Sequence, residues 1–427
     1  MKDSAIQSSR FGRFVKLARL GASTGASLAL SRNGSAAAGA AAEVLGELRG
    51  LAAKVGQMAS YVDGIVPEAH RDAYFNALKS LQARAVSSPI AAVRARIQSE
   101  LGAPVEELFA SFEETPFASA SIGQVHRAVL VDGRVVAVKV QHPDIDRAVA
   151  SDLDNASMVK SLVGSLAPRA LEVDAIWQEI RSRFEAELDY ANEASELDAF
   201  RLVHADDPHV LIPGVVRERS SRRVLTTDFV DGLSFDEVTT LPEAERARYA
   251  ETLWRFVFKG LLVHRVFNAD PHPGNYVFLP SGRVAFLDFG CTQVIDVENN
   301  KAARAMHFAA LDRDEEAFEH AVHEYLGTRG GPYEGAVTGL VRAMFTPLFE
   351  DEFRFTPRFV SDIVGGMQEL KRHALSRKSG FVPMRPSMVF LNRLQFGFYS
   401  VLARLDTTVS YSRLEGRILA DAGLRAG

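Results

Sequence analysis

Three residues between positions 270 and 288 have the types and the spacing that phosphoryl transfer requires. Asp270 and Asn275 lie in the stretch Asn268–Asn275, and Asp288 follows Asn275 by thirteen residues. In this chemistry one Asp orients or deprotonates the attacking group, while an Asn and a second Asp supply hard oxygen ligands that hold Mg²⁺ against nucleotide phosphates. We therefore predict that Asp270 is catalytic and that Asn275 and Asp288 bind Mg²⁺.

Lys139 lies upstream of these residues, at the end of a predicted strand. It closes the stretch Val136–Lys139, which has the pattern in which a lysine reaches the α- and β-phosphates of ATP. A tripeptide such as Asp288-Phe-Gly occurs by chance, but four elements in this order along the chain form a strong joint signal. We predict that Lys139 has both a catalytic and a nucleotide-binding role.

The loop that would cover the phosphates contains alanine and serine where Gly-x-Gly-x-x-Gly is the common pattern. Side chains restrict the backbone of such a loop and crowd its approach to phosphate, so we expect nucleotide to be held in a different way. Phe229 and Val230, at the end of a later predicted strand, are assigned to the same nucleotide site. The loop residues assigned to it are Ala118, Ser119, Ala120 and Ser121.

Hydrophobic periodicity and turn residues place these side chains on strands that are followed by helices. The pair Asp132-Gly133 predicts a two-residue hairpin, and Pro280-Ser281-Gly282 predicts a second hairpin. The expected strands are Gln124–Val131, Arg134–Gln141, Arg223–Val230, Tyr276–Leu279 and Arg283–Leu287. The expected helices cover 172–203 as one long helix, 243–266, and most of the chain from Asn299 onward.

These elements predict an α+β, protein-kinase-like bilobal fold with a small sheet-containing N-lobe, a helical C-lobe and an N-terminal helical extension. We place the extension at 1–103, the N-lobe at 104–230 and the C-lobe at 231–427. No Ala-Pro-Glu follows the Asp-Phe-Gly tripeptide, and about ten residues separate it from the next helix, which leaves no room for a peptide-docking platform. Ala269 stands where protein kinases have Arg, so control by activation-loop phosphorylation is not indicated.

Composition excludes several other classes of protein. The 427 residues include 49 Lys and Arg against 54 Asp and Glu, and the resulting net charge of -5 argues against a protein that coats nucleic acid. The single cysteine, Cys291, cannot form an intrachain disulfide, and no Cys or His group has zinc spacing. No run of about 18 apolar residues is present, so we predict no membrane-spanning helix.

The first 42 residues form a basic segment with six basic residues and one acidic residue. Phe11, Phe14 and Val15 lie on one face at helical spacing and are flanked by Arg and Lys, as in a helix that lies on an anionic membrane. A helix docked on its own protein has the same pattern, so both interpretations stay open. We expect a cytoplasmic protein, with peripheral contact on the inner membrane as the further alternative.

Taken together, these motifs resemble the UbiB/AarF family of atypical kinases, the group that includes the ADCK-type kinases associated with coenzyme Q in mitochondria. The resemblance rests on Lys54-Val-Gly-Gln57, Ala118-Ser-Ala-Ser-Ile-Gly-Gln-Val-His126, Val-Ala-Val-Lys139, Glu187-Leu-Asp189-Tyr-Ala-Asn-Glu193, Asp-Pro-His-Pro-Gly-Asn275 and Asp288-Phe-Gly. It implies that Glu193 pairs with Lys139. It also implies that the Glu-x-Asp motif meets the Lys-x-Gly-Gln motif over the active site and thereby suppresses protein phosphorylation. The four residues of these two motifs are Glu187, Asp189, Lys54 and Gln57.

The resemblance also implies a function. The protein would be an atypical kinase or ATPase that uses ATP and Mg²⁺ to hydrolyse ATP or to phosphorylate a small molecule or lipid, in support of isoprenoid-quinone biosynthesis or lipid homeostasis at a membrane. Its implied partners are a lipid or quinone-precursor ligand and quinone-biosynthesis enzymes, and not nucleic acid. The family usually has His two residues before the catalytic Asp, where this chain has Asn268.

Two alternatives come from other classes of function. The first is a non-catalytic, nucleotide-gated lipid-binding or scaffold protein, and the second is a conventional Ser/Thr protein kinase. The retained Asp270, Asn275 and Asp288 argue against the first, because a scaffold has no need for all three. The missing glycine-rich loop and the short activation segment argue against the second.

Overall fold

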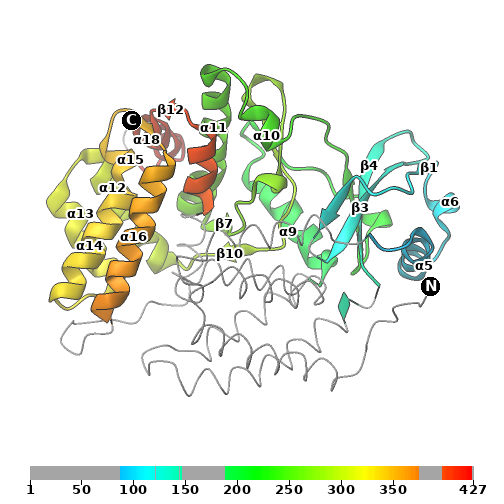
Figure 1. The fold of residues 1–427 in the computed structure, drawn as a ribbon, viewed down its shortest axis with the longest axis horizontal. Coiled ribbons are helices and arrows are strands. Elements are labelled where there is room, and N and C mark those ends of the chain that lie inside the picture. Colours follow the sequence, from blue (N-terminus) through cyan, green and yellow to red (C-terminus); the bar gives the residue numbers. More distant parts are fainter. Residues whose placement is uncertain (1–86, 121, 144, 147–187, 375–396, 426–427) are drawn as a thin grey trace, which may run out of the picture. The chain divides into compact units, whose positions relative to one another are not determined.

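The computed structural model describes residues 87–120, 122–143, 145–146, 188–374 and 397–425. The described residues form two compact units. The first contains the described parts of 87–146, 188–191 and 216–227, and the second contains 192–215 and all that is described from 228 onward. Figure 1 shows the elements of both units in the order of the chain. Four residues of the predicted site lie outside the described residues: Lys54, Gln57, Ser121 and Glu187.

The first unit is built on a sheet with the strand order β1-β3-β4-β6, in which β2 also pairs with β3. The predicted first hairpin is confirmed, because β3 and β4 pair antiparallel from Gly123 opposite Gln141 to Val129 opposite Val135. Gly133 closes the turn with a φ of 87°, a conformation that residues with a Cβ rarely adopt. The strands are β1 (Ser111–Phe112), β2 (Ala118–Ala120), β3 (Gly123–Val129), β4 (Val135–Gln141) and β6 (Val224–Asp228).

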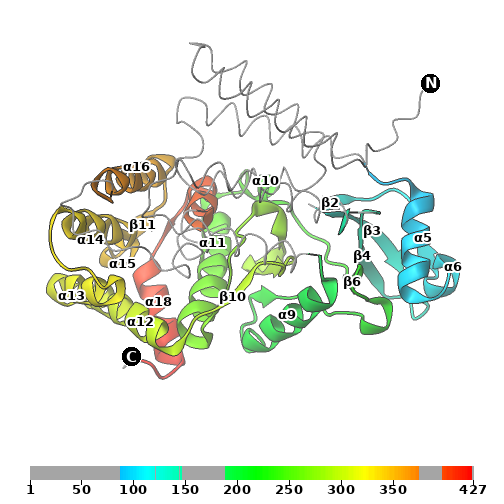
Figure 2. The same cartoon turned by 90° about the horizontal axis from the view of Figure 1, so that it is seen from below.

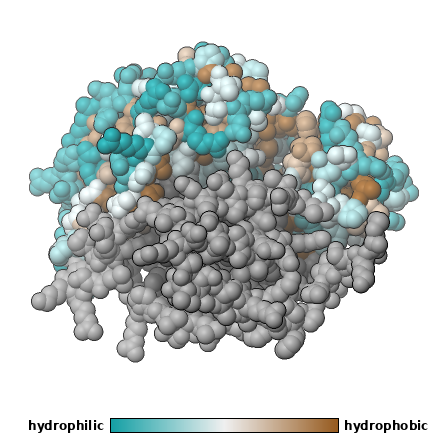
Figure 3. All heavy atoms as spheres, viewed as in Figure 1, coloured by the Kyte–Doolittle hydropathy of each residue, from teal (hydrophilic) through white to brown (hydrophobic). Residues whose placement is uncertain are grey.

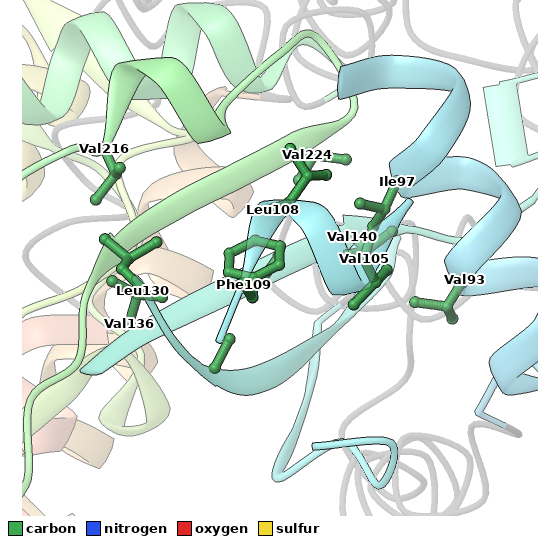
Figure 4. Packing of buried hydrophobic residues seen from close by; sticks show 12 residues of the cluster. Val93, Ile97, Val105, Leu108, Phe109, Leu130, Val136, Val140, Val216 and Val224 are labelled. Carbon is green, nitrogen blue, oxygen red and sulfur yellow. The ribbon is translucent and has the colours of Figure 1, made fainter. Parts of the chain in front are cut away.

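Two helices, α5 (Ile90–Leu101) and α6 (Val105–Leu108), cover one face of this sheet (Figure 2). Alternate residues of β4 point to that face and are fully buried, as expected for a strand with one side in a core. Figure 4 shows how the side chains from the helices and strands pack together. Burial of each such side chain contributes about 1.5–3 kcal/mol. The core consists of Val93, Ile97, Val105, Leu108, Phe109, Ala128, Leu130, Val136, Val138, Val140, Val216 and Val224.

The helix α9 (Tyr190–Val203) begins later than the single long helix predicted over 172–203. Residues 188–189 are not helical, so the prediction of an unbroken helix is wrong at this point. The physical reason is local, because the side chain of Asp189 accepts the N–H of Ala191 at 3.0 Å and so competes with a preceding helical turn. Asp189 therefore precedes α9, whereas Glu193 lies in its first turn.

Among the described residues of the second unit, short strands form three small sheets, one of which has the order β5-β9-β8. The predicted second hairpin is confirmed, because β8 and β9 pair antiparallel with Tyr276 opposite Phe286, and the turn contains the 3-10 segment Pro280–Gly282. The remaining pairs are β7 with β10 and β11 with β12. The strands are β5 (Val210–Leu211), β7 (Val266–Asn268), β8 (Tyr276–Phe278), β9 (Val284–Phe286), β10 (Thr292–Val294), β11 (Phe353–Arg354) and β12 (Thr408–Val409).

Helices make up most of the second unit, in agreement with the predicted helical C-terminal part. In Figure 1, α12 lies beside α13 and α14 beside α16. The side chain of Asp296 caps α12 by accepting the N–H of Asn299 at 2.8 Å, which sets the start of this helix. The helices are α10 (Phe235–Val238), α11 (Glu243–Phe258), α12 (Val297–Asp312), α13 (Glu315–Leu326), α14 (Pro332–Met344), α15 (Thr346–Phe349), α16 (Pro357–Ala374), the segment 397–405 and α18 (Tyr411–Asp421).

The helix predicted around 243–266 is confirmed as far as His264. After α11 the chain continues as a π-helix, Lys259–His264, and β7 then begins at Val266. A Cβ on Gly260 would lie 2.7 Å from the carbonyl oxygen of Val266, which shows that the following strand passes close to this turn. The side chain of Asn300 donates to the carbonyl of Leu261 at 2.8 Å and thereby satisfies a group that the wider helix leaves open.

His204 lies at the end of α9 and is buried in the second unit. Its ring stacks on Phe256 with the centroids 4.8 Å apart, and Phe200 lies on the same aromatic cluster. Neither ring nitrogen of His204 has a hydrogen-bond partner in the described part of the chain. Burial, together with the charge of Lys259, lowers the pKa of His204 from its usual value to about 3, so the ring is neutral in the folded protein.

This neutral histidine makes a prediction for the effect of pH on stability. Unfolding returns the pKa of His204 to about 6.5, so between pH 6.5 and 3 the unfolded state binds the extra proton and stability falls as the pH falls. The contribution is up to about 1.4 kcal/mol per pH unit. We expect His204→Phe, which keeps a ring against Phe256, to have a shallower loss of unfolding free energy below pH 6.5 in urea titrations. Parallel pH profiles for the two proteins would contradict the assignment.

No helix in the described part of the chain is long and apolar enough to cross a membrane. Figure 3 shows hydrophilic residues over most of the coloured surface in that view, with apolar residues in small groups.

Candidate functional site

The pairing of β7 with β10 frames the segment that carries Asp270. Asn268, the last residue of β7, lies opposite Thr292 of β10. The N–H of Ala269 then donates to the carbonyl of Cys291 at 2.8 Å and extends the pairing by one step. The residues before Asp270 therefore lie beside those that follow the Asp-Phe-Gly tripeptide.

Asp270 and Asn275 are joined directly. The side-chain Nδ2 of Asn275 lies 3.2 Å from the carbonyl oxygen of Asp270 and 3.4 Å from its Oδ2. His272 closes the loop between them, because its N–H donates to the Asp270 carbonyl at 2.7 Å and its Nδ1 accepts the N–H of Gly274 at 3.1 Å. His272 thus shapes the loop backbone, and the loop holds the carboxylate of Asp270 against the amide of Asn275.

Asp288 follows β9 and is fixed through its own backbone. Its carbonyl accepts Nδ2 of Asn268 at 2.5 Å, and its Oδ1 accepts the N–H of Gly290 at 3.0 Å. The next residue, Phe289, is fully buried and its ring centroid lies 4.9 Å from that of Phe200 on α9. The side chain of Asp288 is half-buried, so its carboxylate is held in position but remains partly exposed.

One hydrogen-bonded network therefore contains the three residues predicted from their spacing. Asn275 bonds to Asp270, and its carbonyl accepts the N–H of Leu287 at 3.0 Å, one residue before Asp288. Asn268 bonds to both acids, through the N–H of Asp270 and the carbonyl of Asp288. The structure brings Asp270, Asn275 and Asp288 together as the sequence analysis expected.

The donor atoms in this network suit Mg²⁺ that arrives with a nucleotide. Among the described residues, no group of three or more His, Cys, Asp or Glu could hold a metal ion by itself. Asp288 and Asn275 offer one carboxylate and one amide oxygen, and these are hard donors. Mg²⁺ commonly uses one or two protein oxygens and completes its octahedral shell with phosphate oxygens and water. The residues present thus fit a metal shared with phosphates.

Lys139 lies in the first unit, on β4 and opposite Val125 of β3. Its Nζ is 4.8 Å from the ring centroid of Tyr190, a cation–π contact at the start of α9. Tyr190 is fully buried, and a Cβ on Gly123 would lie 2.9 Å from its hydroxyl oxygen. Gly123 therefore leaves room for the ring that supports the ammonium group of Lys139.

Two residues that the sequence analysis did not single out share the face of the sheet that presents Lys139. Residues paired across strands share a face, and faces alternate along a strand, so Val125 and Ala137 project on the same side as Lys139. Both are half-buried, whereas Val136 and Val138 on the other face are fully buried. The alternation within Val-Ala-Val-Lys is the sequence signal that could have found Ala137.

The alanine-rich loop lies at the edge of the same sheet. Ala118 and Ser119 are exposed, and β2 pairs Ala118 with Val125 and Ala120 with Gly123. Val125 also lies opposite Lys139 of β4, so one strand, β3, separates Ala118 at the start of the loop from Lys139. Its binding role stays a prediction.

Phe229 and Val230 follow directly after β6 and are half-buried. Glu193 on α9 is buried, with 3% of its surface exposed. It belongs to the second unit, whereas Lys139 belongs to the first. The nucleotide contacts of Phe229 and Val230 and the pairing of Glu193 with Lys139 stay predictions.

Asp189 lies next to a basic residue of the first unit. Its Oδ2 is 3.6 Å from Nε of Arg222, and both side chains are partly exposed. The predicted partners of Asp189, Lys54 and Gln57, lie outside the described residues, as does Glu187. The predicted contact between the Glu-x-Asp and Lys-x-Gly-Gln motifs therefore stays a prediction.

Comparison with known proteins gives a consistent result. Residues 80–322 match the family described as "ABC1 atypical kinase-like domain". The chain is 36% identical over 252 residues to "Atypical kinase coq-8, mitochondrial" of Caenorhabditis elegans, which covers 58% of this chain and 33% of that protein. It is 33% identical over 276 residues to "Atypical kinase COQ8B, mitochondrial" of Rattus norvegicus, which covers 64% of this chain and 51% of that protein. The chain thus spans about a third to a half of the length of these curated relatives.

A solved structure is similar over most of the chain. The complex of Rv3197 with erythromycin from Mycobacterium tuberculosis matches with a TM-score of 0.64 and 26% sequence identity, covering 86% of this chain and 91% of that chain. Together with the family match, this similarity confirms the α+β kinase-like fold predicted from the sequence.

Proposed function

The chain belongs to the ABC1 atypical kinase-like family, also called UbiB/AarF, and from this membership we propose that it is an ATP-dependent phosphotransferase or ATPase that uses Mg²⁺. The acceptor we propose is water, a small molecule or a lipid. The observation that carries the proposal is the network that joins Asp270, Asn275 and Asp288 through hydrogen bonds of 2.5–3.4 Å. Phosphoryl transfer depends mainly on such positioning and on charge stabilisation.

The three side chains in this network suit different tasks. Mg²⁺, when bound with ATP, neutralises negative charge on the phosphates. Asp288 and Asn275 would hold it through a carboxylate and an amide oxygen. Asp270, oriented by the amide of Asn275, would accept a proton from the attacking hydroxyl or water, or would hold that group in line.

Residues upstream of this network would bind the rest of the nucleotide. Lys139, supported by the ring of Tyr190, would bind the α- and β-phosphates, and Glu193 would hold that lysine in place. Val125 and Ala137 would lie against the base. The other residues proposed for nucleotide binding are Ala118, Ser119, Ala120, Ser121, Phe229 and Val230.

Two observations support an acceptor other than protein. In the described stretch between the Asp-Phe-Gly tripeptide and α12, which begins at Val297, β10 is the only element, so this stretch is too short for a substrate peptide to dock on it. The similar structure from Mycobacterium tuberculosis holds erythromycin, a large organic molecule, and this supports an organic ligand for the fold. We propose a role in isoprenoid-quinone biosynthesis or lipid homeostasis, with the basic N-terminal segment in peripheral contact with a membrane.

The test is phosphate release from Mg-ATP, measured with and without anionic liposomes and a phenolic quinone-precursor analogue. We expect turnover that depends on Mg²⁺ and rises with lipid or phenol. A chain that lacks residues 1–20 should lose the response to liposomes but keep the response to phenol. Efficient phosphorylation of generic proteins would instead support a conventional protein kinase. Nucleotide binding without any turnover would support the nucleotide-gated scaffold.

Gly397 provides a prediction about the catalytic loop. A Cβ at this position would lie 2.7 Å from Cγ of Pro271, a rigid ring next to Asp270. Because the ring cannot bend away, Gly397→Ala must shift the loop, and we expect kcat to fall about tenfold with a loss of stability of about 1–2 kcal/mol. Gly416→Ala is the matched control, because its Cβ would meet nothing within 4 Å. Equal kcat values for the two variants would show that the contact does not position the loop.

A further inference from the structure

Asn268 joins the main chains of the two acidic residues with one amide group. Its Nδ2 donates to the carbonyl of Asp288 at 2.5 Å, and its Oδ1 accepts the N–H of Asp270 at 3.0 Å. The second contact spans two residues and forms a local turn of the kind that Asn and Asp side chains stabilise. The first contact spans twenty residues and reaches the Asp-Phe-Gly segment.

The polarity of these two bonds fixes the orientation of the amide. Turning the group over would set its NH₂ against the N–H of Asp270 and its oxygen against the carbonyl of Asp288, so both contacts would become repulsive. Asn268 is also held at its backbone, because it ends β7 opposite Thr292. The side chain thus has one arrangement that satisfies both acidic residues at once.

We propose that Asn268 is a positioning residue that holds the backbones of Asp270 and Asp288 in register. The proposal rests on the proposed function, since it assigns a task within the same site. A side-chain amide carries both a donor and an acceptor, so this one residue can make both bonds at once.

The experiment compares two substitutions in the full chain. Asn268→Ala removes both bonds, and we expect kcat to fall about 10–30-fold with a change in the KM for ATP below about threefold. Asn268→Ser keeps a short acceptor for Asp270 but cannot reach Asp288, and we expect a loss of about 3–10-fold.

A second readout does not depend on turnover. Amide hydrogen exchange of the nucleotide-free protein should be faster at Asp270 in Asn268→Ala by about tenfold, and close to native in Asn268→Ser. Asn300→Ala is the matched control, since it removes one amide-to-carbonyl bond elsewhere in the second unit. This control should lower stability without a selective loss of kcat.

The outcomes separate the two proposals. If the native chain has no turnover but the exchange pattern is as expected, the positioning role stands and the proposed function fails. Native kcat and native exchange in Asn268→Ala would overturn the positioning role.

Discussion

Asp288→Asn is expected to lower kcat for ATP turnover by about 10²–10³-fold, the loss typical of removing one pre-positioned charge partner of a transition state. The substitution keeps the size of the side chain and an oxygen that can accept the N–H of Gly290 at the present 3.0 Å. The loop should therefore keep its shape while the negative charge that attracts Mg²⁺ is lost. Phosphate release across a Mg²⁺ titration measures both effects.

The metal dependence distinguishes a lost ligand from a disturbed fold. We expect the Mg²⁺ concentration for half-maximal turnover to rise, while nucleotide binding without Mg²⁺ stays equal or becomes tighter, because a negative charge no longer faces the phosphates. Asp296→Asn is the matched control. It removes a carboxylate from the same segment, and Asn caps a helix as well as Asp does, so α12 and turnover should be retained within about twofold. Native Mg²⁺ dependence in Asp288→Asn would assign the metal to another residue.

The parts of the fold that could be predicted are those that short-range patterns decide. Asp132-Gly133 between two β-branched runs can form little else than a tight hairpin, and the structure has β3 and β4 on either side of it. The spacing of Asp270, Asn275 and Asp288 is also local, since one hairpin, β8 with β9, accounts for the chain between the last two. The network that joins them follows from that hairpin and from the β7–β10 pair.

The details that were not predicted depend on specific polar and backbone contacts, which hydrophobic periodicity does not report. The pattern over 172–203 does not reveal that the side chain of Asp189 caps α9, which begins at Tyr190. The apolar run near 260 predicts a helix but does not reveal that this helix widens into a π-helix where Gly260 lies close to Val266.

Asn268 shows how far sequence reasoning reaches at the site itself. Its type was identified as a departure from the expected histidine, but the sequence cannot say which groups the amide meets. The structure gives it two partners, one nearby in the chain at Asp270 and one distant at Asp288. The amide of Asn268, which stands where the family usually has His, is chemically able to make both bonds.

A buried polar cluster in the second unit gives the prediction with the largest effect on stability. Glu415 on α18 is fully buried, and it bonds to Nδ1 of His307 on α12 at 2.5 Å and to Nε1 of Trp254 on α11 at 3.2 Å. The ring of His307 also packs edge-on against Phe345, with centroids 4.8 Å apart. Three helices that are distant in sequence are thus joined through one carboxylate.

Breaking this cluster from one side should cost far more than removing it entirely. His307→Phe keeps an aromatic ring against Phe345 but leaves Trp254 as the one partner of the Glu415 carboxylate among the described residues, and we expect the free energy of unfolding in urea to fall by about 3–5 kcal/mol. The double variant His307→Phe/Glu415→Leu removes the stranded charge and should regain most of that loss. A cycle of the two single variants and the double variant therefore gives a large coupling energy.

An exposed ion pair in the same unit shows how little unfolding free energy the loss of a surface pair should cost. Arg404 and Asp236 lie 2.7 Å apart with 50% and 86% of their side chains exposed, and Asp236→Ala should cost no more than about 1 kcal/mol. If His307→Phe costs as little as this exposed pair, the carboxylate of Glu415 must find another donor, and the helices are held together by their apolar contacts alone. A loss of several kcal/mol that the double variant reverses shows instead that burial of one unmatched charge, and not the lost ring contact, decides the stability of this part of the fold.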